Sequence, residues 1–339
     1  MNIWLPTIRA GSGTDVFTER LAGELNARGH KALITWFPHF REVLPFAMAG
    51  RMPAGTQVIH ANSWHAPFMG STKVPIVATI HHCTYDQAAM LYKSVLQRLY
   101  HSSIARRYEG RTLASAAAVT AVSQAAASGA LRAFPVLAKH ISIIHNWVDA
   151  RAFSPGSSGA RRDRKPFRLL FVGRWSRLKG IDLLPEVMRR LGPGFELRIL
   201  TSLDGRVDSR TAVRDAVMLP RVAPSDMAAV YRDSDALLFP SRAEGFGYVA
   251  LEAQACGLPV VAFRVSSLPE VVEHGVTGWL ADLDDVEAMA TFLKRLASDP
   301  ALYSGMREAA RARVLRNFGA DAAISAYCGA YERAIAESV

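Results

Sequence analysis

Two carboxylates beside a glycine-rich turn are the residues whose types and spacing most clearly predict chemistry. Glu244 and Glu252 are separated by seven residues, and two glycines, Gly245 and Gly247, lie between them. The apolar run 236–240 predicts a buried strand, and a helix is expected just after the second glycine. Unpaired N–H groups and the helix dipole favour an anion there, and the glycines let a phosphate approach the backbone. Two acids beside a phosphate site suit a hydroxyl-rich ligand.

The segment around these acids resembles the signature of retaining GT-B glycosyltransferases, family four in the usual classification. The matching residues are, in order, Glu244-Gly245-Phe246-Gly247, Glu252-Ala253, Gly257-Leu258-Pro259-Val260-Val261, Pro269-Glu270-Val271-Val272 and Gly275-Val276-Thr277-Gly278. The resemblance implies that Glu244 contacts the hydroxyls of a donor sugar and that Glu252 holds the ribose of its nucleotide. It also implies a donor diphosphate site at the loop and the helix amides, which comprises Gly245, Phe246, Gly247, Tyr248 and Val249.

The chain departs from the family pattern at one turn of this segment. The family usually has glycines just before its Pro-Glu pair, whereas this chain has Ser266 and Ser267, which affects how closely a ligand approaches the backbone there. The alternative interpretation of Glu244 and Glu252 is a pair of solvated surface acids. A carboxylate pair also suits glycoside hydrolysis, but this pair stands in a nucleotide-site motif, and we expect no covalent nucleophile.

A loop with two cations resembles a second element of the same family. A strand is expected over 167–172, and the following Gly173-Arg174 and Lys179-Gly180 resemble the family's G-R-x4-K-G loop. The resemblance implies that both cations, Arg174 and Lys179, face the donor diphosphate, where they neutralise leaving-group charge without a metal. The alternative is a basic surface loop. Arg221 stands in a segment that surrounds the nucleobase in the family, so we also expect it at the donor, although the base itself is not indicated.

The first half of the chain has its own strand and glycine loop. Residues 2–8 predict a strand, which is followed by Gly11, Ser12 and Gly13 before a helical pattern. The family has a glycine loop here that leads to its acceptor site, so the resemblance implies acceptor binding by these three residues. A dinucleotide-binding fold is the rival, but Val16 stands where its G-x-G-x-x-G fingerprint needs a third small residue. A plain strand-to-helix turn is the other alternative.

A histidine follows a later predicted strand. The run 76–80 is apolar, and Thr79-Ile80-His81 at its end resembles a Thr-x-His element of the family. Open parallel sheets bind ligands at the carboxyl ends of their strands. The resemblance therefore implies that His81 lies beside the donor sugar, and a purely structural histidine is the alternative.

Length and composition favour two globular domains. The chain has 339 residues, of which 50% are hydrophobic, which excludes general disorder. We predict an α/β fold of the GT-B type, with two Rossmann-like domains facing each other across a cleft. The predicted parts are an acceptor-binding domain (1–153), a linker (154–165), a nucleotide-sugar domain (166–318) and a C-terminal helix that packs back on the first domain (319–339). Three widely spaced cysteines predict neither a disulfide framework nor a zinc site.

Positive charge is concentrated in the first half of the chain. Residues 1–153 carry 15 Lys and Arg against 7 Asp and Glu, residues 154–165 carry 4 against 1, and residues 166–339 carry 21 against 22. The excess favours an anionic partner, either a charged acceptor or an anionic membrane surface, with a mere surplus of surface charge as the alternative. No nucleic-acid partner is expected. Residues 90–111 predict a basic amphipathic helix that either packs on the core or touches acidic lipid.

These features together predict a retaining, metal-independent hexosyltransferase. It would move a hexosyl unit from a nucleotide-diphosphate sugar to a glycan or lipid-linked acceptor, in the synthesis of cell-surface polysaccharide or glycolipid. No cofactor is expected, because the nucleotide sugar is a substrate. No apolar run approaches the length of a membrane span, so we expect a cytoplasmic protein whose membrane contact is at most peripheral. The alternatives are a phosphorylase or nucleotide-sugar epimerase of the same fold, and a non-catalytic protein that binds sugar nucleotides or lipids.

Overall fold

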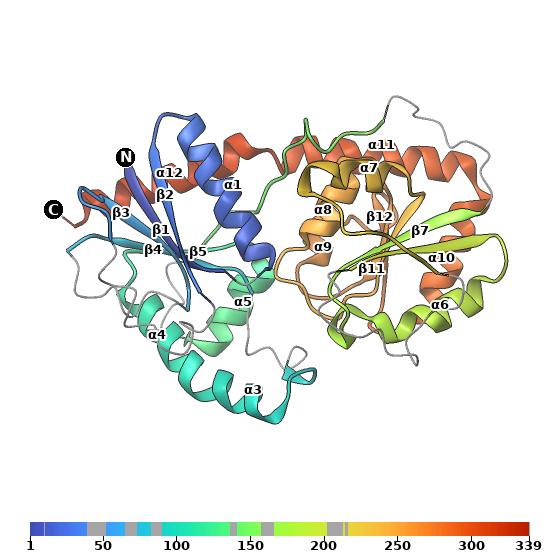
Figure 1. The fold of residues 1–339 in the computed structure, drawn as a ribbon, viewed down its shortest axis with the longest axis horizontal. Coiled ribbons are helices and arrows are strands. Elements are labelled where there is room, and N and C mark those ends of the chain that lie inside the picture. Colours follow the sequence, from blue (N-terminus) through green and yellow to red (C-terminus); the bar gives the residue numbers. More distant parts are fainter. Residues whose placement is uncertain are drawn as a thin grey trace. The chain divides into compact units, whose positions relative to one another are not determined.

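The computed structural model of this protein describes residues 1–9, 11–38, 52–64, 73–82, 90–135, 141–156, 166–201, 213 and 216–338. These residues form two compact units, each built on a six-stranded parallel sheet with helices packed against it (Figure 1). The first unit comprises Met1–Asn146 together with Ala320–Val339, and the second comprises Trp147–Gly319. The predicted α/β class is confirmed. Within the described ranges, no helix combines the length and the apolar character needed to cross a bilayer.

The first unit contains a parallel sheet in the order β2-β1-β3-β4-β5-β6. Its strands are β1 (Asn2–Ile8), β2 (Lys31–Phe37), β3 (Val58–Asn62), β4 (Ile76–Ile80), β5 (Ala118–Ala121) and β6 (Ile141–Ile143). Its helices are α1 (Gly13–Ala27), α3 (Val95–Tyr100), the π-helical η4 (His101–Ala105), α4 (Arg106–Ser115), α5 (Gln124–Ala133) and α12 (Ala320–Ala336). Every residue of β3 and β4 is buried, as expected of parallel strands covered on both faces.

The second unit contains a parallel sheet in the order β12-β11-β10-β7-β8-β9. Its strands are β7 (Phe167–Val172), β8 (Phe195–Leu200), β9 (Val217–Met218), β10 (Ala236–Phe239), β11 (Val260–Phe263) and β12 (Gly278–Ala281). Its helices are η6 (Arg177–Lys179), η7 (Ile181–Leu183), α6 (Leu184–Leu191), η8 (Pro224–Asp226), α7 (Met227–Arg232), α8 (Tyr248–Ala255), α9 (Leu268–Val271), α10 (Val286–Ser298) and α11 (Pro300–Asn317). Because β10 pairs directly with β7, the strand order reverses between these two strands.

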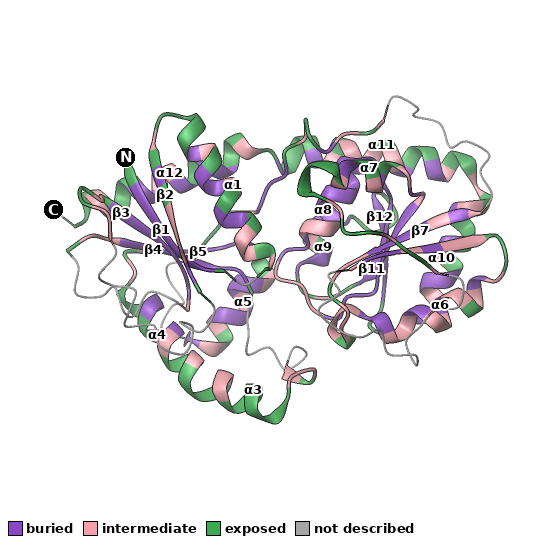
Figure 2. Cartoon of the chain, in the orientation of Figure 1, coloured by how far each residue is buried: buried purple, intermediate pink, exposed green. Residues whose placement is uncertain are grey.

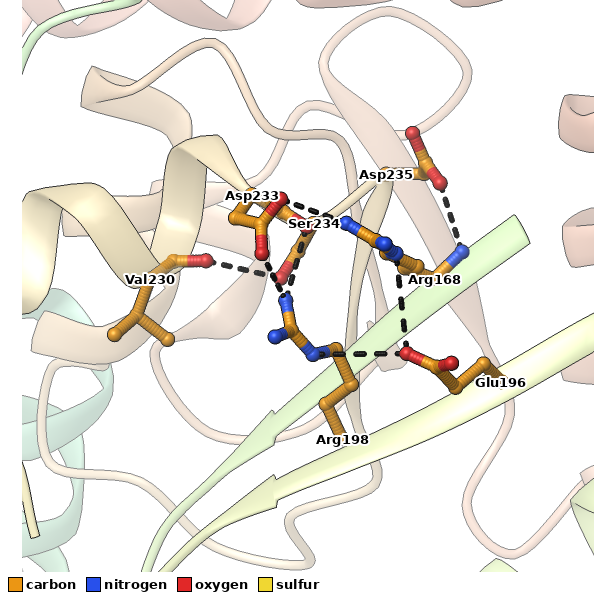
Figure 3. Close-up of polar contacts among 7 residues, drawn as sticks. All are labelled: Arg168, Glu196, Arg198, Val230, Asp233, Ser234 and Asp235. Atoms are coloured by element: carbon orange, nitrogen blue, oxygen red, sulfur yellow. Dashed lines mark hydrogen bonds and ion pairs between the residues drawn. The ribbon is translucent and has the colours of Figure 1, made fainter. Parts of the chain in front are cut away.

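A network of charged residues fixes β10 beside β7 at the amino ends of these strands (Figure 3). The Asp233 carboxylate accepts hydrogen bonds from Nη1 of Arg168 and Nη1 of Arg198, each at 2.7 Å. The Asp235 carboxylate accepts from the backbone N–H of Arg168, also at 2.7 Å. Asp235 directly precedes β10 and Asp233, the C-cap of α7, lies three residues before it, whereas the two arginines lie on β7 and β8. The alignment of these strands is therefore set at the end of the sheet opposite to the one that carries the predicted site.

The second unit begins before the predicted linker. Residues 147–153 were predicted in the first domain but belong to the second unit. Arg311 on α11 holds them there, because its guanidinium donates to the carbonyls of Ala150 and Phe153, each at 2.7 Å. The fully buried Trp147 anchors the start of the segment. Residues 157–165 of the predicted linker lie outside the described residues, and α12 belongs to the first unit.

The basic helix predicted over 90–111 has different bounds in the structure. Helical structure begins at Val95, continues through η4 and ends with α4 at Ser115. No residue of α3 or η4 is buried, whereas α4 buries Glu109, Thr112 and Leu113. Packing on the core, one of the two alternatives for this helix, therefore applies only to α4.

A buried polar network joins α12 to the first sheet. His60 on β3 is 3% exposed, and its Nε2 lies 3.1 Å from Thr79 Oγ1 while its Nδ1 lies 2.7 Å from the Tyr331 hydroxyl on α12. The rings of Phe17 and Tyr327 lie 5.7 and 5.5 Å from the imidazole, centroid to centroid. Burial among these uncharged groups lowers the pKa of His60 to about 3.

The stability of the first unit should therefore decrease as the pH falls from 8 to 5. Between the folded pKa of about 3 and the unfolded value of 6.5, His60 binds a proton only when the chain unfolds. The contribution of neutral His60 to the free energy of unfolding is complete above pH 6.5 and is reduced by about 2 kcal/mol at pH 5. The non-titrating variant His60→Gln should lack this part of the pH dependence in denaturant titrations. The same pH dependence in both proteins would contradict the assignment.

Candidate active site

The loops that follow β7 and β10 lie against each other at the carboxyl ends of these strands. Gly180 ends the turn after β7 with a φ of +75°, and a Cβ on it would lie 2.1 Å from the carbonyl oxygen of Pro240, which follows β10. Only glycine therefore permits this approach. The strand order reverses between β7 and β10, so the two loops meet where an open parallel sheet binds ligands.

An ion pair joins a residue from each of the two loops. Lys179 Nζ contacts Glu244 Oε1, and the two side chains are 24% and 11% exposed. The Lys179 ammonium also lies 5.8 Å from the centroid of the Phe239 ring. An ammonium binds phosphate oxygens, and a carboxylate accepts from sugar hydroxyls. The ion pair therefore places a phosphate-binding ammonium next to a hydroxyl-binding carboxylate, which are the functions that the sequence predicts for Lys179 and Glu244.

A buried arginine lies two residues before Glu244. The Arg242 side chain is 5% exposed and donates to both carboxylate oxygens of Asp182, at 2.7 and 3.0 Å, and to Asp284 at 2.7 Å. Burial alone would raise the pKa of the Asp182 carboxyl, but the hydrogen bonds from Arg242 hold it below its ordinary value. A bidentate contact and a second carboxylate together fix the guanidinium in one orientation.

The same arginine holds the turn that carries Lys179. Its Nη1 donates to the carbonyl of Arg177 at 2.5 Å, and its backbone N–H donates to the carbonyl of Leu178 at 2.9 Å. Lys179 is the next residue, so the place of its ammonium beside Glu244 depends on Arg242. This role was missed in the sequence, because nothing in the local pattern distinguishes a buried, paired arginine from a surface cation.

Glu252 lies one turn into α8, as predicted, and its carboxylate is in the protein interior. The residue is 8% exposed and accepts a hydrogen bond from the hydroxyl of Tyr231 at 3.0 Å. Tyr231 is fully buried on α7 and was not predicted as part of the site. A carboxylate accepts several hydrogen bonds at once, which suits the adjacent hydroxyls of a ribose.

The turn between the two glutamates depends on its second glycine. Gly247 is the N-cap of α8 with a φ of +96°, and a Cβ on it would lie 3.1 Å from a side-chain carbon of Leu268. Phe246 is buried, and its ring packs edge-on against Phe318 at 5.9 Å. The Phe246 ring therefore anchors the turn, and only its backbone is placed to meet a ligand. Gly245, Tyr248 and Val249 are half-buried.

One of the two serines that stand in place of the family's glycines has a glycine-like backbone conformation. Ser266 has a φ of +48°, a left-handed conformation that costs a residue with a side chain about 1–2 kcal/mol. Ser267 is fully buried, and its Oγ donates to the carbonyl of Glu244 at 3.3 Å. Ser266 therefore adopts a backbone conformation that favours glycine, and Ser267 adds a bond to the Glu244 loop.

The other two predicted cations of the second unit lie on the surface. Arg174 directly follows Gly173 at the exposed start of the loop after β7. Arg221 is exposed three residues after β9, which is two strands away from β7 in the sheet. The structure thus brings Lys179 and Glu244 together, whereas Arg221 is exposed in the segment that follows the edge strand β9.

The residues predicted from the first half lie at the carboxyl edge of the first sheet. Gly11 follows β1 with a φ of +59°, Ser12 is the N-cap of α1, and Gly13 is the first residue of that helix. His81 directly follows β4 and is 6% exposed, and its Nε2 lies 2.8 Å from Oδ1 of Asn62 at the end of β3. The order of the first sheet reverses at β1, so this edge is again the expected ligand-binding edge.

Comparison with known proteins matches each half of the chain to a family of glycosyltransferases. Residues 158–313 match the family described as glycosyl transferases group 1, and residues 34–152 match glycosyltransferase family 4. The D-inositol 3-phosphate glycosyltransferase of Pseudarthrobacter chlorophenolicus is 35% identical over 289 residues, which are 78% of this chain and 68% of that protein. The chain belongs to the group 1 glycosyltransferases. Proteins of this group bind a nucleotide-sugar donor and an acceptor.

Solved structures show the same fold over almost the whole of this glycosyltransferase. Sucrose-phosphate synthase from Thermosynechococcus elongatus is similar with a TM-score of 0.84 and 20% identity, over 99% of this chain and 100% of its own. HepE of Anabaena, solved with UDP and glucose, is similar with a TM-score of 0.79 and 18% identity, over 98% of this chain and 99% of its own. These similarities confirm the predicted GT-B fold.

Proposed function

We propose that this group 1 glycosyltransferase moves a hexosyl unit from a nucleotide-diphosphate sugar to a glycan or lipid-linked acceptor, with retention of configuration and without an essential metal ion. The donor diphosphate binds at Arg174, Lys179 and the amides that begin α8. Glu244 holds the donor sugar and Glu252 the ribose. The ion pair of Lys179 with Glu244, at the point where the sheet order reverses, supports this assignment most strongly.

The transfer requires little proton chemistry from the protein. The bond from the anomeric carbon to the diphosphate oxygen breaks, and the acceptor oxygen bonds to that carbon from the same face. The departing phosphate oxygen takes the acceptor proton. Negative charge grows on the diphosphate during this step, and a cation already held in place, as Lys179 is by Glu244, stabilises it without reorganisation.

The names of similar proteins indicate which donors and acceptors should be tested first. The Pseudarthrobacter relative and one from Catenulispora acidiphila, 29% identical over 84% of this chain and 74% of its own, are named D-inositol 3-phosphate glycosyltransferases. HepE was solved with UDP and glucose. We therefore place UDP-sugars first among donors, and a phosphorylated inositol beside lipid-linked and glycan acceptors. The excess of Lys and Arg in residues 1–153 suits a phosphorylated acceptor.

Product analysis with and without an acceptor tests the proposed reaction. Purified protein in EDTA should release nucleoside diphosphate and form a glycoside only when an acceptor is present, and NMR should show the donor's anomeric configuration in the product. Sugar phosphate formed from inorganic phosphate would indicate a phosphorylase, and a new nucleotide sugar an epimerase. Donor binding without turnover would indicate a non-catalytic protein. Activity lost in EDTA and restored by magnesium or manganese would contradict the metal-free scheme.

Glu252→Ala should weaken binding of the free nucleotide by roughly tenfold to a hundredfold, because hydrogen bonds to a charged acceptor contribute about 1.5–3 kcal/mol. Calorimetry with UDP and with UDP-sugars measures this directly. Glu244→Ala should leave the affinity for UDP unchanged and lower only the extra affinity for the sugar. Tyr231→Phe is a matched control, because it removes the hydroxyl that bonds Glu252 and keeps the carboxylate. Equal losses of UDP affinity in the two glutamate variants would show that the roles are divided wrongly.

A further inference from the structure

Five large apolar side chains are exposed on one short stretch of the first unit. In the described chain, Leu91, Val95, Leu96, Leu99 and Ile104 are 74%, 62%, 79%, 60% and 45% exposed. Four of them belong to α3 and η4, which bury no residue, and Figure 2 shows α3 largely in the colour of exposed residues. Val95 and Leu99 lie one helical turn apart, and Leu96 lies three residues before Leu99, so these side chains share one face of the helix.

Burial of this face does not contribute to the folding of α3. The helix begins with a capping box, in which Ser94 Oγ accepts from the Gln97 N–H at 3.2 Å and Gln97 Oε1 accepts from the Ser94 N–H at 3.0 Å. It continues through η4 into α4, where the buried carboxylate of Glu109 accepts from Ser63 Oγ at 2.6 Å. Local capping and an anchored continuation therefore hold the helix, and its apolar face stays exposed.

The exposed charges along this helix are all positive. Arg98, Arg107 and Arg111 are exposed, whereas Glu109, the only acid in residues 90–111, is buried. Arg106 is exposed as well, but its guanidinium donates to the carbonyl of Ala133 at the end of α5 at 3.0 Å. An apolar helical face accompanied by cations and no exposed acid is the pattern of a helix that lies in the interface of an anionic bilayer.

We propose that α3 and η4 dock this protein on an anionic lipid surface. The apolar face formed by Val95, Leu96 and Leu99 enters the boundary between headgroups and acyl chains, and the exposed arginines bind lipid phosphates. A protein partner would need acids placed opposite each arginine, whereas an anionic membrane offers negative charge along the whole helix. This attachment goes beyond sugar transfer and does not depend on the identity of the donor or the acceptor.

Co-sedimentation with vesicles of phosphatidylcholine and phosphatidylglycerol tests the proposal. Arg98, Arg107 and Arg111 changed together to glutamine should lower the partition coefficient at low salt by at least about tenfold, since each cation near the surface contributes roughly fivefold. A matched control changes Lys31, Lys294 and Arg316 to glutamine, which removes the same charge from exposed positions elsewhere. The control should bind nearly as the wild type does. High salt should release the wild type.

A second pair of variants separates insertion from electrostatic attraction. Leu96→Gln with Leu99→Gln should lower binding by at least about tenfold, because apolar side chains lose their transfer into the bilayer boundary. Leu283 and Leu315, which are 48% and 56% exposed in the second unit, provide the matched control when changed to glutamine. The proposal is overturned if the wild type does not bind anionic vesicles at low salt, or if the α3 variants bind as their controls do. It is also overturned if the leucine change only converts a dimer to a monomer in sedimentation velocity.

Discussion

Replacing Lys179 with alanine should lower the rate constant of sugar transfer by about 10²–10³-fold and weaken donor binding by less than about tenfold. The diphosphate is already charged in the bound donor, but its charge increases as the bond to the anomeric carbon breaks. A cation at this place therefore stabilises the transition state more than the ground state. Single-turnover kinetics and calorimetry with the donor measure the two effects separately. Arg174→Ala should change both quantities in the same direction.

The control for this prediction lies in the same turn. Arg177 also carries a positive charge, but its side chain is 74% exposed and its Nε lies 3.7 Å from Asp182. Arg177→Ala should change the rate constant by less than about threefold, because an exposed ion pair contributes little. Lys179→Arg keeps the charge and should recover part of the activity. If Lys179→Ala weakens donor binding as much as it slows transfer, then Lys179 binds the donor uniformly and does not act on the leaving group.

Some strands of this protein could be predicted because their sequences are almost uniformly apolar. The runs 76–80 and 167–172 coincide with β4 and β7, and the run 236–240 contains β10. Parallel strands that are covered on both faces have this composition. The order of the strands could not be predicted in the same way. The contact of Lys179 with Glu244, 65 residues apart, exists because β7 and β10 are neighbours, and no local pattern encodes that pairing.

The supporting residues of the site were missed for a related reason. Arg242 bonds Asp182 and Asp284, which are 60 and 42 residues away. Ion pairs over such separations produce no regular spacing of residues in the sequence. The glycine loops were recognised because a backbone with positive φ, such as that of Gly180 and Gly247, restricts the residue type at its own position. Local constraints were therefore visible in the sequence, whereas partners supplied by distant segments were not.

Whether the apolar face of the helix predicted over 90–111 is buried could not be predicted either. Apolar and basic residues spaced along 90–111 indicated a helix with two faces, but spacing alone cannot tell whether the apolar face is covered. Burial of Glu109 and Leu113 on α4 and exposure of Leu96 on α3 distinguish the two halves of the helix. The boundary at Trp147 is a similar case, since the hydrogen bonds from Arg311 that place residues 150 and 153 in the second unit come from α11.

Arg242→Ala should lower the free energy of unfolding of the second unit by about 1.5–3 kcal/mol, because the carboxylates of Asp182 and Asp284, which are 21% and 44% exposed, lose their charged hydrogen-bond donor. Asp182 would lose both of its hydrogen bonds to the guanidinium, and Asp284 would lose one. Denaturant titration measures the loss. Arg190→Ala is the control, because its ion pairs with Glu186 and Glu287 involve a side chain that is 35% exposed. We expect a change of about 0–1 kcal/mol for that variant.

A second variant separates the stability of the unit from the placement of Lys179. Arg242→Met combined with Asp182→Asn removes both charges, so little buried charge is left unpaired and the unit should regain much of its stability. The bond from Nη1 of Arg242 to the carbonyl of Arg177 is still lost, whereas the bond from the backbone N–H of residue 242 to the carbonyl of Leu178 is retained. We therefore expect the double variant to fold and bind UDP, but to transfer sugar at least about tenfold more slowly, since misplacement of a catalytic cation is costly. Transfer at the wild-type rate by a folded double variant would show that Arg242 contributes to stability alone, and that Gly180 and the Glu244 ion pair suffice to position Lys179.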